Sequence, residues 1–598
     1  MKKYLAFILC LSFTATYAQQ HSTSLAKAEA LRKAEQQTVL LNNKANLIPL
    51  ENLSRYHAAV LHYNDRQAPV FDSITGRYKA VKSFYIDTIS STESFHALHD
   101  QLKFYNLVIV RLSSLNTPLI NFLKQIENNR QLIIVCSGAQ NLASLGAFRS
   151  PVIWNEDDSE MNASVAAQII FGGMAASGRL KTAYGLFPKG AGFTTSKTRL
   201  GYAFPESVKL NSEQLNNIDS IVTAGIAAHS APSAVILLVK DGKVIFHKAY
   251  GHHTYNISSQ ASQPDDIFDL ASITKVSATT QAVMGLYDKG LLKLEDPISQ
   301  YVTVNKNIPD KKDIKIKEAL LHEAGYTPYI KFFEKLQPGD MSHDSSALYP
   351  TKVADGYFLR AGYFDSVMWP VTLASPVLTR GKYVYSDVSM YMMKEVVENI
   401  THQPLNEYLD NGLYARLGMQ TMGYLPRNRF TRQRIVPTTE NDNWFRNMLV
   451  QGYVNDPGAA MAGGVEGHAG LFADANDMAI LFQMLLNKGS YGGETFYKPA
   501  TVELFTSGQS KVSSRALGFA RVADNLPSSS GLASASSFGH SGYTGTFVWA
   551  DPAYNMIYIC LTNRVYPDDG KTYGPAKVNI RPLALDVFYK AVLNSRKE

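Results

Sequence analysis

Short apolar runs alternate with amphipathic segments of helical period between residues 19 and 205. The apolar runs cover residues 58–63, 84–88, 107–112, 132–136 and 152–154, and the amphipathic segments cover 93–105, 116–127 and 161–172. Strands that alternate with helices at this spacing join into a parallel sheet that helices cover. The pattern therefore predicts an α/β domain with a mostly parallel sheet over residues 19–205.

The pattern changes near residues 205–211. Two strand pairs at residues 234–249 and 547–561 surround Asp241-Gly242 and Asp551-Pro552, which are turn residues, and a helical pattern follows at 583–593. Such pairs are typical of antiparallel hairpins. Residues 206–598 therefore predict an α+β domain with an antiparallel sheet built from both of its ends and a helical subdomain between them.

The first 18 residues read as an export signal. Lys2 and Lys3 precede an apolar run at residues 4–13, and Thr16-Tyr17-Ala18 forms a cleavage site before Gln19. The run is too short to span a bilayer, and no later segment is long enough. The sequence therefore predicts a periplasmic or secreted protein with no membrane span after signal removal.

Composition narrows the function classes. The chain of 598 residues is 45% hydrophobic and 18% charged, which is typical of a globular protein of two or more domains. Its net charge of +7 is not concentrated in any run of Lys or Arg, so nucleic acid is not an expected partner. After signal removal Cys136 and Cys560 remain, each in an apolar run, and we expect buried free thiols.

An acidic cluster follows the last apolar run of the first half. It consists of Glu156, Asp157, Asp158 and Glu160. These side chains could hold a ligand, but a solvated strand end that leads into the next helix also explains them, because acidic residues suit a helix N-terminus. The half contains no GxGxxG and no Walker-type loop, so a nucleotide is not expected.

The segment Asp269-Leu270-Ala271-Ser272-Ile273-Thr274-Lys275 carries candidate chemistry. Apolar residues recur after it at helical spacing, which places Ser272 in the first turn of a helix. Lys275, three residues on, then lies on the same face about 5–6 Å away at Cβ. A lysine in a dry site can help to remove the proton of a serine hydroxyl, although a Ser-x-x-Lys tetrapeptide by itself also occurs at ordinary helix starts.

Two later motifs strengthen this interpretation. Tyr385-Ser386-Asp387 precedes a helical stretch, and His540-Ser541-Gly542 opens an edge-like strand. A phenol, a lysine and a serine can share protons, with Tyr385 as the group that gives and takes them. The backbone N–H groups of Ser272 and Tyr543 could then hold a developing oxyanion.

The three motifs, in this order, resemble the serine hydrolases of the penicillin-binding-protein and class C β-lactamase type. The resemblance extends over about residues 211–590. It implies a β-lactamase/transpeptidase-like fold, an acyl-enzyme on Ser272, and Lys275 and Tyr385 as its catalytic partners. It further implies an oxyanion hole from the N–H groups of Ser272 and Tyr543, and no metal or other cofactor. The residues expected to orient the substrate are Asp387, His540, Ser541 and Gly542.

Two positions depart from the pattern of the antibiotic-hydrolysing members. Asp387 stands where they usually carry Asn, and His540 stands where they carry Lys, as in the esterase and D-amino-acid peptidase branches. A lysine would be charged permanently, whereas a histidine is mostly neutral at pH 7. Asp387 could also keep Lys275 protonated, which would move the role of base toward Tyr385; which of the two is the main base stays open.

The expected function is hydrolysis of an ester or amide. The expected substrate is a D-amino-acid peptide or ester of the cell wall, derived from peptidoglycan. Two alternatives remain: hydrolysis of β-lactams, or a silent penicillin-binding-like protein that binds the wall without turnover. His322 and His468 suggest a metal site, but no carboxylate or Cys lies at ligand spacing beside either, so packing or loop hydrogen bonding is the expected role.

The first half resembles the C-terminal α/β sandwich domain of glycoside hydrolase family three. The resemblance rests on residues 39–50 (VLLNNKANLIPL) and 172–180 (GGMAASGRL). In larger bacterial proteins this domain links a glycosidase barrel to a β-lactamase-like domain, but too few residues precede it here for a barrel. We therefore expect no glycosidase activity and a scaffold or residual sugar-binding role for this domain.

Overall fold

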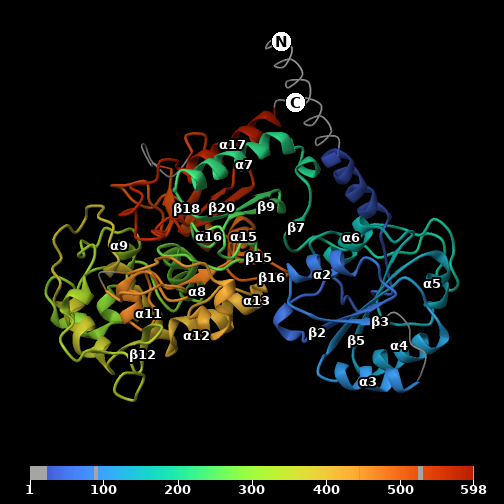
Figure 1. Ribbon diagram of the computed structural model, residues 1–598, viewed down its shortest axis with the longest axis horizontal. Helices are drawn as coiled ribbons and strands as arrows, with labels where there is room; N and C mark the ends of the chain where they lie inside the picture. Colours follow the sequence, from blue (N-terminus) through green and yellow to red (C-terminus); the bar gives the residue numbers. More distant parts are fainter. Residues whose placement is uncertain (1–22, 87–91, 443–444, 523–529, 597–598) are drawn as a thin grey trace, which may run out of the picture.

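The computed structural model describes residues 23–86, 92–442, 445–522 and 530–596. The described chain forms two lobes, with the N-terminal part in one and the remainder in the other (Figure 1). A helix over residues 23–37 leads into the first lobe. The predicted export signal at residues 1–18 lies outside the described residues. None of the helices within the described ranges is long and apolar enough to cross a membrane.

A six-stranded sheet forms the centre of the first lobe, in the order β1-β6-β5-β4-β2-β3. Its five strands from β2 to β6 are parallel, and β1 is antiparallel to its neighbour β6, as the sequence predicts for a mostly parallel sheet. The strands are β1 (Val39–Leu41), β2 (Ala58–Tyr63), β3 (Lys82–Ile86), β4 (Leu107–Leu112), β5 (Gln131–Ser137) and β6 (Val152–Asn155). Most are continuous apolar runs because helices cover both faces.

The helices of this lobe divide between the two faces of its sheet. Val60 and Ile109 pack toward α2 (Ala68–Gly76) and α6 (Glu160–Phe171). Val108 and Val110 pack toward α3 (Thr92–Leu102), α4 (Thr117–Asn129) and α5 (Ala139–Ser144). Alternate residues of a strand point to opposite faces, so each strand serves two apolar clusters.

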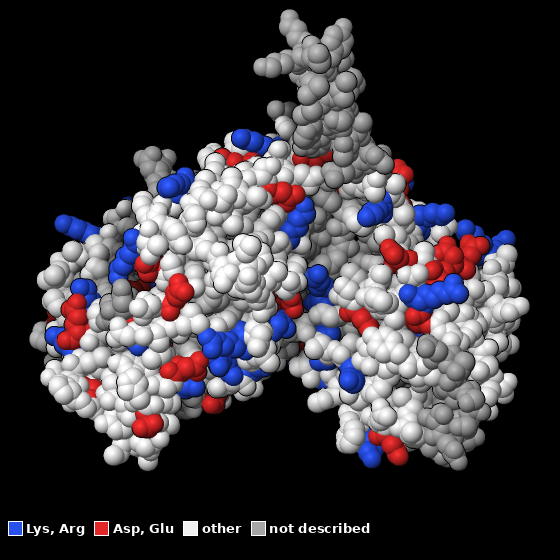
Figure 2. All heavy atoms as spheres, viewed as in Figure 1, with Lys and Arg blue, Asp and Glu red and all other residues white. Residues whose placement is uncertain are grey.

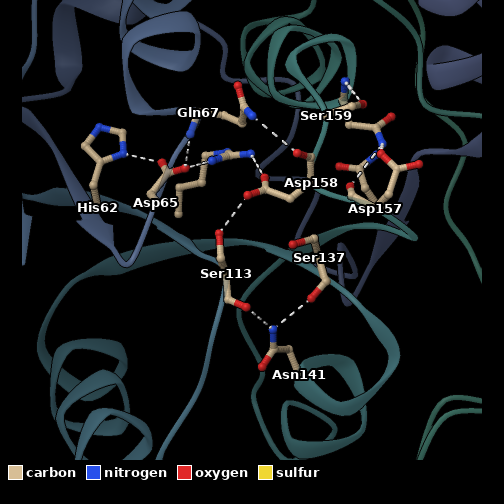
Figure 3. Close-up of polar contacts among 12 residues, drawn as sticks. His62, Asp65, Gln67, Ser113, Ser137, Asn141, Asp157, Asp158 and Ser159 are labelled. Carbon is tan, nitrogen blue, oxygen red and sulfur yellow. Dashed lines mark hydrogen bonds and ion pairs between the residues drawn. The ribbon is translucent and has the colours of Figure 1, made fainter. Parts of the chain in front are cut away.

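A polar network closes the carboxyl edge of this sheet, where β2 and β4 lie side by side (Figure 3). Arg111, at the end of β4, pairs with Asp65 and lies 2.5 Å from Asp158. Ser113 donates to Asp158 at 2.9 Å, and His62 contacts Asp65 at 2.6 Å. Asp158 is therefore half-buried and paired with β4, rather than simply solvated at a strand end as the sequence analysis favoured.

A seven-stranded sheet forms the centre of the second lobe, in the order β17-β18-β19-β20-β8-β9-β7. Its members are β7 (Gly201–Tyr202), β8 (Ser233–Lys240), β9 (Lys243–Gly251), β17 (Ala520–Arg521), β18 (Phe538–Ser541), β19 (Phe547–Asp551) and β20 (Met556–Thr562). Both predicted hairpins are present. In the first, Asp241 and Gly242 have φ of 52° and 68°, as a tight type I′ turn requires.

Two helix layers enclose this sheet. One face carries α7 (Ser212–Ala227) and α17 (Ile580–Asn594), which lie side by side in Figure 1. The other carries α8 (Thr280–Asp288) and α15 (Ala475–Leu486). Beyond α8 lies the predicted helical subdomain, which includes α9 (Ile316–Leu320), α11 (Val388–Thr401), α12 (Leu405–Leu409) and a small sheet β11-β13-β12 within residues 341–359.

Buried polar contacts join the two lobes. Arg199 donates to the carbonyl of Leu50 at 2.5 Å in the first lobe and to that of Gly492 at 3.4 Å in the second. The hydroxyl of Tyr202 donates to Asn476 at 2.6 Å. Because β7 already pairs with β9, the chain enters the second sheet at Gly201, slightly before the predicted boundary at residue 205.

The two cysteines of the described chain are buried free thiols, as predicted. Cys136 lies in β5 and Cys560 in β20. Burial raises the pKa of Cys136 to about 12 and that of Cys560 to about 11, so both remain protonated and unreactive at neutral pH.

Candidate active site

Ser272 lies at the start of a helix, as the sequence predicts. The chain leaves β10 (Phe268–Asp269), turns at Ala271 with φ of 45°, and enters the helix directly after Ser272. Asp269 fixes this turn, because its two carboxylate oxygens accept from the N–H of Ala271 at 2.8 Å and of Asn455 at 2.7 Å. Ser272 is thereby held half-exposed at the helix start.

Lys275 lies in the π-helical turn η3 (Lys275–Thr279) and is completely buried. Its Nζ atom lies 2.9 Å from Oγ of Ser272, 2.8 Å from Oδ1 of Asp387 and 3.1 Å from the carbonyl oxygen of His468. Burial by itself would lower the pKa of Lys275, but Asp387 and Tyr385 outweigh it and the pKa is raised. Lys275 is therefore an ammonium group at neutral pH.

The segment Tyr385-Ser386-Asp387 reaches this lysine from the N-terminus of α11. The Nζ atom of Lys275 lies 5.0 Å from the centroid of the Tyr385 ring. The segment is held by a neighbouring loop, since the N–H of Ser386 donates to Nδ1 of His322 at 3.2 Å and that of Asp387 to the carbonyl of Pro328 at 2.9 Å. The His322 ring also packs on Tyr385 with 4.5 Å between centroids. His322 thus has the packing and loop-bonding role expected from the sequence.

The third motif lies at the end of a strand rather than at its beginning. β18 ends at Ser541, and Gly542 begins the turn into β19, so the prediction that this motif opens a strand is wrong. The motif still has the predicted edge character, because β17 pairs only with Phe538 and Gly539. A side of β18 at His540 and Ser541 is thereby left for an extended substrate.

The turn after Ser541 is tied to the chain that precedes Ser272. Thr544 donates to the carbonyl of Asp269 at 2.7 Å and Thr546 to that of Leu270 at 3.1 Å. A Cβ on Gly542 would lie 2.4 Å from the Leu270 carbonyl oxygen, so only glycine permits this approach. No described residue accepts from the backbone N–H of Ser272 or Tyr543.

The side chain of Tyr543 leaves the site. Its hydroxyl donates to Asp569, its carbonyl accepts from Arg564 at 2.6 Å, and the residue is largely exposed. The contribution predicted for Tyr543 is that of its backbone N–H, and it stays a prediction.

His540 is neutral at the inner side of the site. Burial, with the charges of Arg515 and Lys275, holds its pKa well below the usual range. Nδ1 bonds to the carbonyl of Ser541 at 2.8 Å, and the ring centroid lies 6.1 Å from that of Tyr385. A permanent positive charge at this position, which a lysine would supply, is absent.

Arg515 also lies at this site, and no sequence pattern indicated it. Its Cζ lies 5.9 Å and 6.0 Å from the ring centroids of Tyr383 and Tyr385, and Nη2 donates to the carbonyl of Gly518 at 2.8 Å. Nε has no hydrogen-bond partner among the described residues, although the side chain is buried. No motif around Arg515 indicates this position, because the residue arrives through folding of a separate loop.

His468, whose carbonyl contacts Lys275, pairs with Asp456, and no sequence pattern indicated this pair. Nε2 of His468 lies 2.8 Å from Oδ1 of Asp456. Burial would lower the pKa of His468, but Asp456 outweighs it and raises that pKa. His468 therefore supports Lys275 through its backbone carbonyl, and its side chain adds a second charge pair.

Within the described ranges, no group of three or more His, Cys, Asp or Glu side chains could hold a metal ion. The groups gathered around the ammonium of Lys275 are the hydroxyl of Ser272, the carboxylate of Asp387 and the ring of Tyr385. A hydroxyl, an ammonium group and a phenol are groups that can take part in nucleophilic attack and proton transfer.

The chain is similar to several known proteins. The family model described as Beta-lactamase matches residues 218–579. An Escherichia coli K12 protein, provisionally named a D-alanyl-D-alanine carboxypeptidase, is 30% identical over 385 residues, which are 60% of this chain and 84% of that protein. The N-acetylmuramyl-L-alanine amidase of Bacillus subtilis 168 is 31% identical over 388 residues, with 60% and 83% covered.

Solved structures are also similar. A penicillin-binding protein homologue from Caulobacter crescentus matches 63% of this chain and 98% of its own, with a TM-score of 0.46 and 18% identity. A β-lactamase-like protein from Bacteroides dorei gives the same TM-score, identity and coverage.

Proposed function

Because the chain belongs to the Beta-lactamase family of serine hydrolases, we propose that it is an exported hydrolase that cleaves an ester or amide of cell-wall material through an acyl-enzyme on Ser272. The observation that carries the proposal is the contact of one ammonium group, Nζ of Lys275, with both Oγ of Ser272 and Oδ1 of Asp387.

Tyr385 is the proposed base. Lys275 is held as an ammonium group by Asp387, so it donates to Oγ of Ser272 and cannot accept its proton. In the proposed step the deprotonated oxygen of Tyr385 accepts that proton while Oγ attacks the carbonyl carbon, which leaves Tyr385 as a neutral phenol. Lys275 and Arg515 both lie beside the Tyr385 ring. The sequence left open whether Lys275 or Tyr385 is the main base. The ion pair between Lys275 and Asp387 favours Tyr385.

The oxyanion that forms is held by the N–H groups of Ser272 and Tyr543. Donors of this kind contribute about 10²–10³ in rate each. Tyr385 then returns its proton to the leaving amine or alcohol, which departs and leaves the acyl group on Ser272. A water molecule then gives one proton to Tyr385 as its oxygen attacks the ester carbonyl. The bond to Oγ breaks, the acyl group leaves as a carboxylic acid, and Tyr385 passes its proton to Oγ, which restores the Ser272 hydroxyl.

The substrate is proposed to be a cell-wall peptide or ester with a D-amino acid at the cleaved bond. The names of the E. coli and B. subtilis relatives both support cell-wall material as the substrate, and the name of the E. coli relative supports the D-amino acid. The neutral His540 offers a hydrogen bond in place of the fixed charge of a lysine. Arg515 is a buried cation beside Tyr385 whose Nε has no hydrogen-bond partner among the described residues. An anionic group of the substrate therefore suits the Arg515 side of the cleft.

The remaining proposals concern organisation and place. Residues 1–18 are proposed as an export signal, residues 19–205 as a domain like the C-terminal domain of glycoside hydrolase family three, and residues 206–598 as the hydrolase. The parallel sheet of the first lobe supports the second proposal. Periplasmic or secreted localisation follows from the signal and suits a wall substrate, and glycosidase activity is not expected.

A kinetic comparison tests the proposed substrate class. The kcat/KM values of a D-Ala-D-Ala peptide, a short acyl ester and nitrocefin are measured for the wild type and for Ser272→Ala. The proposal expects Ser272-dependent hydrolysis of the peptide or the ester at a higher kcat/KM than of nitrocefin. Preference for nitrocefin would make the protein a β-lactamase, and loss of all three activities would indicate a silent binding protein.

A further inference from the structure

A cavity of about 430 Å³ opens at the amino edge of the first-lobe sheet, on the side opposite the network of Figure 3. Its wall is formed by the loop after β1, by η1 (Leu53–Arg55), by the C-terminus of α4, and by the starts of β5 and β6. None of its lining residues belongs to the Ser272 site. A cavity of this volume is large enough for a small ligand.

Three arginines line the cavity: Arg55, Arg130 and Arg149. The side chain of Arg55 is exposed at the rim, as is that of Arg149. Nη1 of Arg130 is enclosed and has no hydrogen-bond partner among the described residues. An enclosed guanidinium nitrogen without an acceptor is costly unless a ligand supplies one.

The two acidic residues of the wall, Glu51 and Glu127, leave the three arginines with one positive charge in excess. Glu127 uses one oxygen to accept from the N–H of Arg149 at 2.9 Å and from the N–H and hydroxyl of Ser150 at 2.7 and 2.6 Å. Its other oxygen lies 3.7 Å from Nε of Arg149. Glu51 is exposed at the rim. The cavity therefore keeps an excess of guanidinium donors over free carboxylates.

Neutral polar side chains complete the wall: Asn42, Asn46, Asn52 and Tyr56. Burial raises the pKa of Tyr56, so its phenol stays protonated and can donate. Asn42 commits its amide nitrogen to the carbonyl of Phe148 at 2.8 Å, which leaves its oxygen as an acceptor. Amide and phenol groups of both kinds suit a ligand rich in hydroxyl groups.

We propose that this cavity is a binding site for an acidic saccharide, a hydroxyl-rich sugar that carries a carboxylate or a phosphate. The guanidinium groups of Arg130 and Arg55 bind the anionic group, since arginine matches carboxylate and phosphate geometry with paired donors. The asparagines and Tyr56 bind the hydroxyl groups. This site is independent of the hydrolase reaction, and its occupant touches a different lobe.

The cavity is fixed to the hydrolase lobe. Glu51 at its rim follows Leu50, whose carbonyl accepts from Arg199, and Arg199 also donates to Gly492 of the other lobe. In addition, η1 packs against α13 (Ala415–Leu417). Figure 2 shows basic side chains gathered along the notch between the two lobes. A sugar held in this cavity is therefore kept beside the catalytic lobe at a constant distance.

Three sugars with one ring test the proposal: glucuronate, glucose 6-phosphate and glucose. Their dissociation constants for the full chain are measured by isothermal titration. We expect saturable binding of glucuronate or glucose 6-phosphate and at least about tenfold weaker binding of glucose, because a hydrogen bond to a charged group contributes this much. The stronger anion identifies carboxylate or phosphate as the natural group, and inorganic phosphate alone is expected to bind more weakly than either.

Variants tie the binding to the cavity. Arg130→Gln and Arg55→Gln are each expected to weaken anion binding about tenfold or more, whereas Arg32→Gln, an exposed arginine of the same lobe outside the cavity, leaves it unchanged. Thermal unfolding and ester hydrolysis at Ser272 are followed in the same samples to establish that the variants are folded. Arg55 is exposed, so its variant keeps the test valid should Arg130→Gln unfold the lobe. Absence of saturable binding of both anions, equal binding of glucose, or binding unaffected in folded variants would overturn the proposal.

Discussion

Oδ1 of Asp387 lies 2.8 Å from Nζ of Lys275, and the same nitrogen lies 2.9 Å from Oγ of Ser272. A carboxylate therefore stands where the antibiotic-hydrolysing relatives usually carry an amide. Asp387 is the largest of the influences that raise the pKa of Lys275 against burial, and Tyr385 adds to it.

Asp387→Asn is expected to move the alkaline limb of the pH–kcat/KM profile to lower pH. Asp387 raises the pKa of Lys275, and the protonated lysine is the active form in this account, so removal of the carboxylate lets the lysine lose its proton earlier. The profile is measured with an acyl ester between pH 5 and about pH 10, a range that spans the reference pKa values. Asp344→Asn, an exposed aspartate, serves as control. An unchanged alkaline limb would argue against Lys275 as an obligatory cation.

Tyr385→Phe is expected to lower kcat by about 10²–10⁴ with little change in KM, since the variant keeps the ring and loses the group that transfers protons. The ring packing on His322 is retained, so the thermal midpoint should stay close to that of the wild type. Steady-state kinetics with an acyl ester give both constants. A variant with near wild-type kcat would transfer the role of base to another residue.

Gly542→Ala is expected to displace the turn that carries the Tyr543 N–H. The added Cβ would lie 2.1 Å from Oγ1 of Thr546 and 2.4 Å from the carbonyl oxygen of Leu270. Overpacking of this kind costs about 1–3 kcal/mol, and the loss of one oxyanion donor costs about 10²–10³ in kcat. Denaturant unfolding and kinetics measure the two effects. Gly412→Ala, where a Cβ meets nothing within 4 Å, is the matched control.

His468→Gln is expected to destabilise the fold most between about pH 4 and pH 6.5, the reference pKa values of the two partners. Asp456 raises the pKa of His468, so that contribution is complete below the unfolded pKa of histidine and is lost as pH rises through the folded one. The pKa of Asp456 is lowered: burial would raise it, and His468 outweighs burial, so its contribution disappears as pH falls toward acid.

Breaking such a buried pair costs about 3–5 kcal/mol in general. The free energy of unfolding of His468→Gln is measured by urea denaturation at pH 5.5 and pH 9, beside the wild type. The difference from wild type should be larger at pH 5.5. A difference that is independent of pH would mean that His468 is neutral in the folded protein.

Local patterns predicted much of this architecture. Most of the parallel strands from β2 to β6 are apolar runs, which the hydrophobic pattern identifies. Asp241-Gly242 indicates its hairpin because few residue pairs adopt two consecutive positive φ angles. The position of Ser272 at a helix start followed from helical spacing after it. The end of β18 at Ser541 was not predicted. Glycines stand on both sides of His540-Ser541, so they do not indicate whether the strand begins or ends there.

Contacts between residues that lie far apart in the sequence were harder to predict. The spacing of Ser272 and Lys275 on one helix predicted their contact, but Tyr385 could be assigned firmly to the same site only through a resemblance. Arg515 could not be assigned to it at all, because contact between distant loops leaves no periodic signal. The same holds for Asp456, whose pairing with His468 depends on the short helix α14 (Pro457–Met461) that it caps. The basic cavity of the first lobe likewise combines three arginines from separate elements.

Covalent labelling with a fluorophosphonate, followed by peptide mapping, tests the central claim most directly. The account predicts one adduct, on Oγ of Ser272, that is absent from Ser272→Ala and greatly slowed in Tyr385→Phe. An adduct on another residue, or none on the folded wild-type protein, would contradict it.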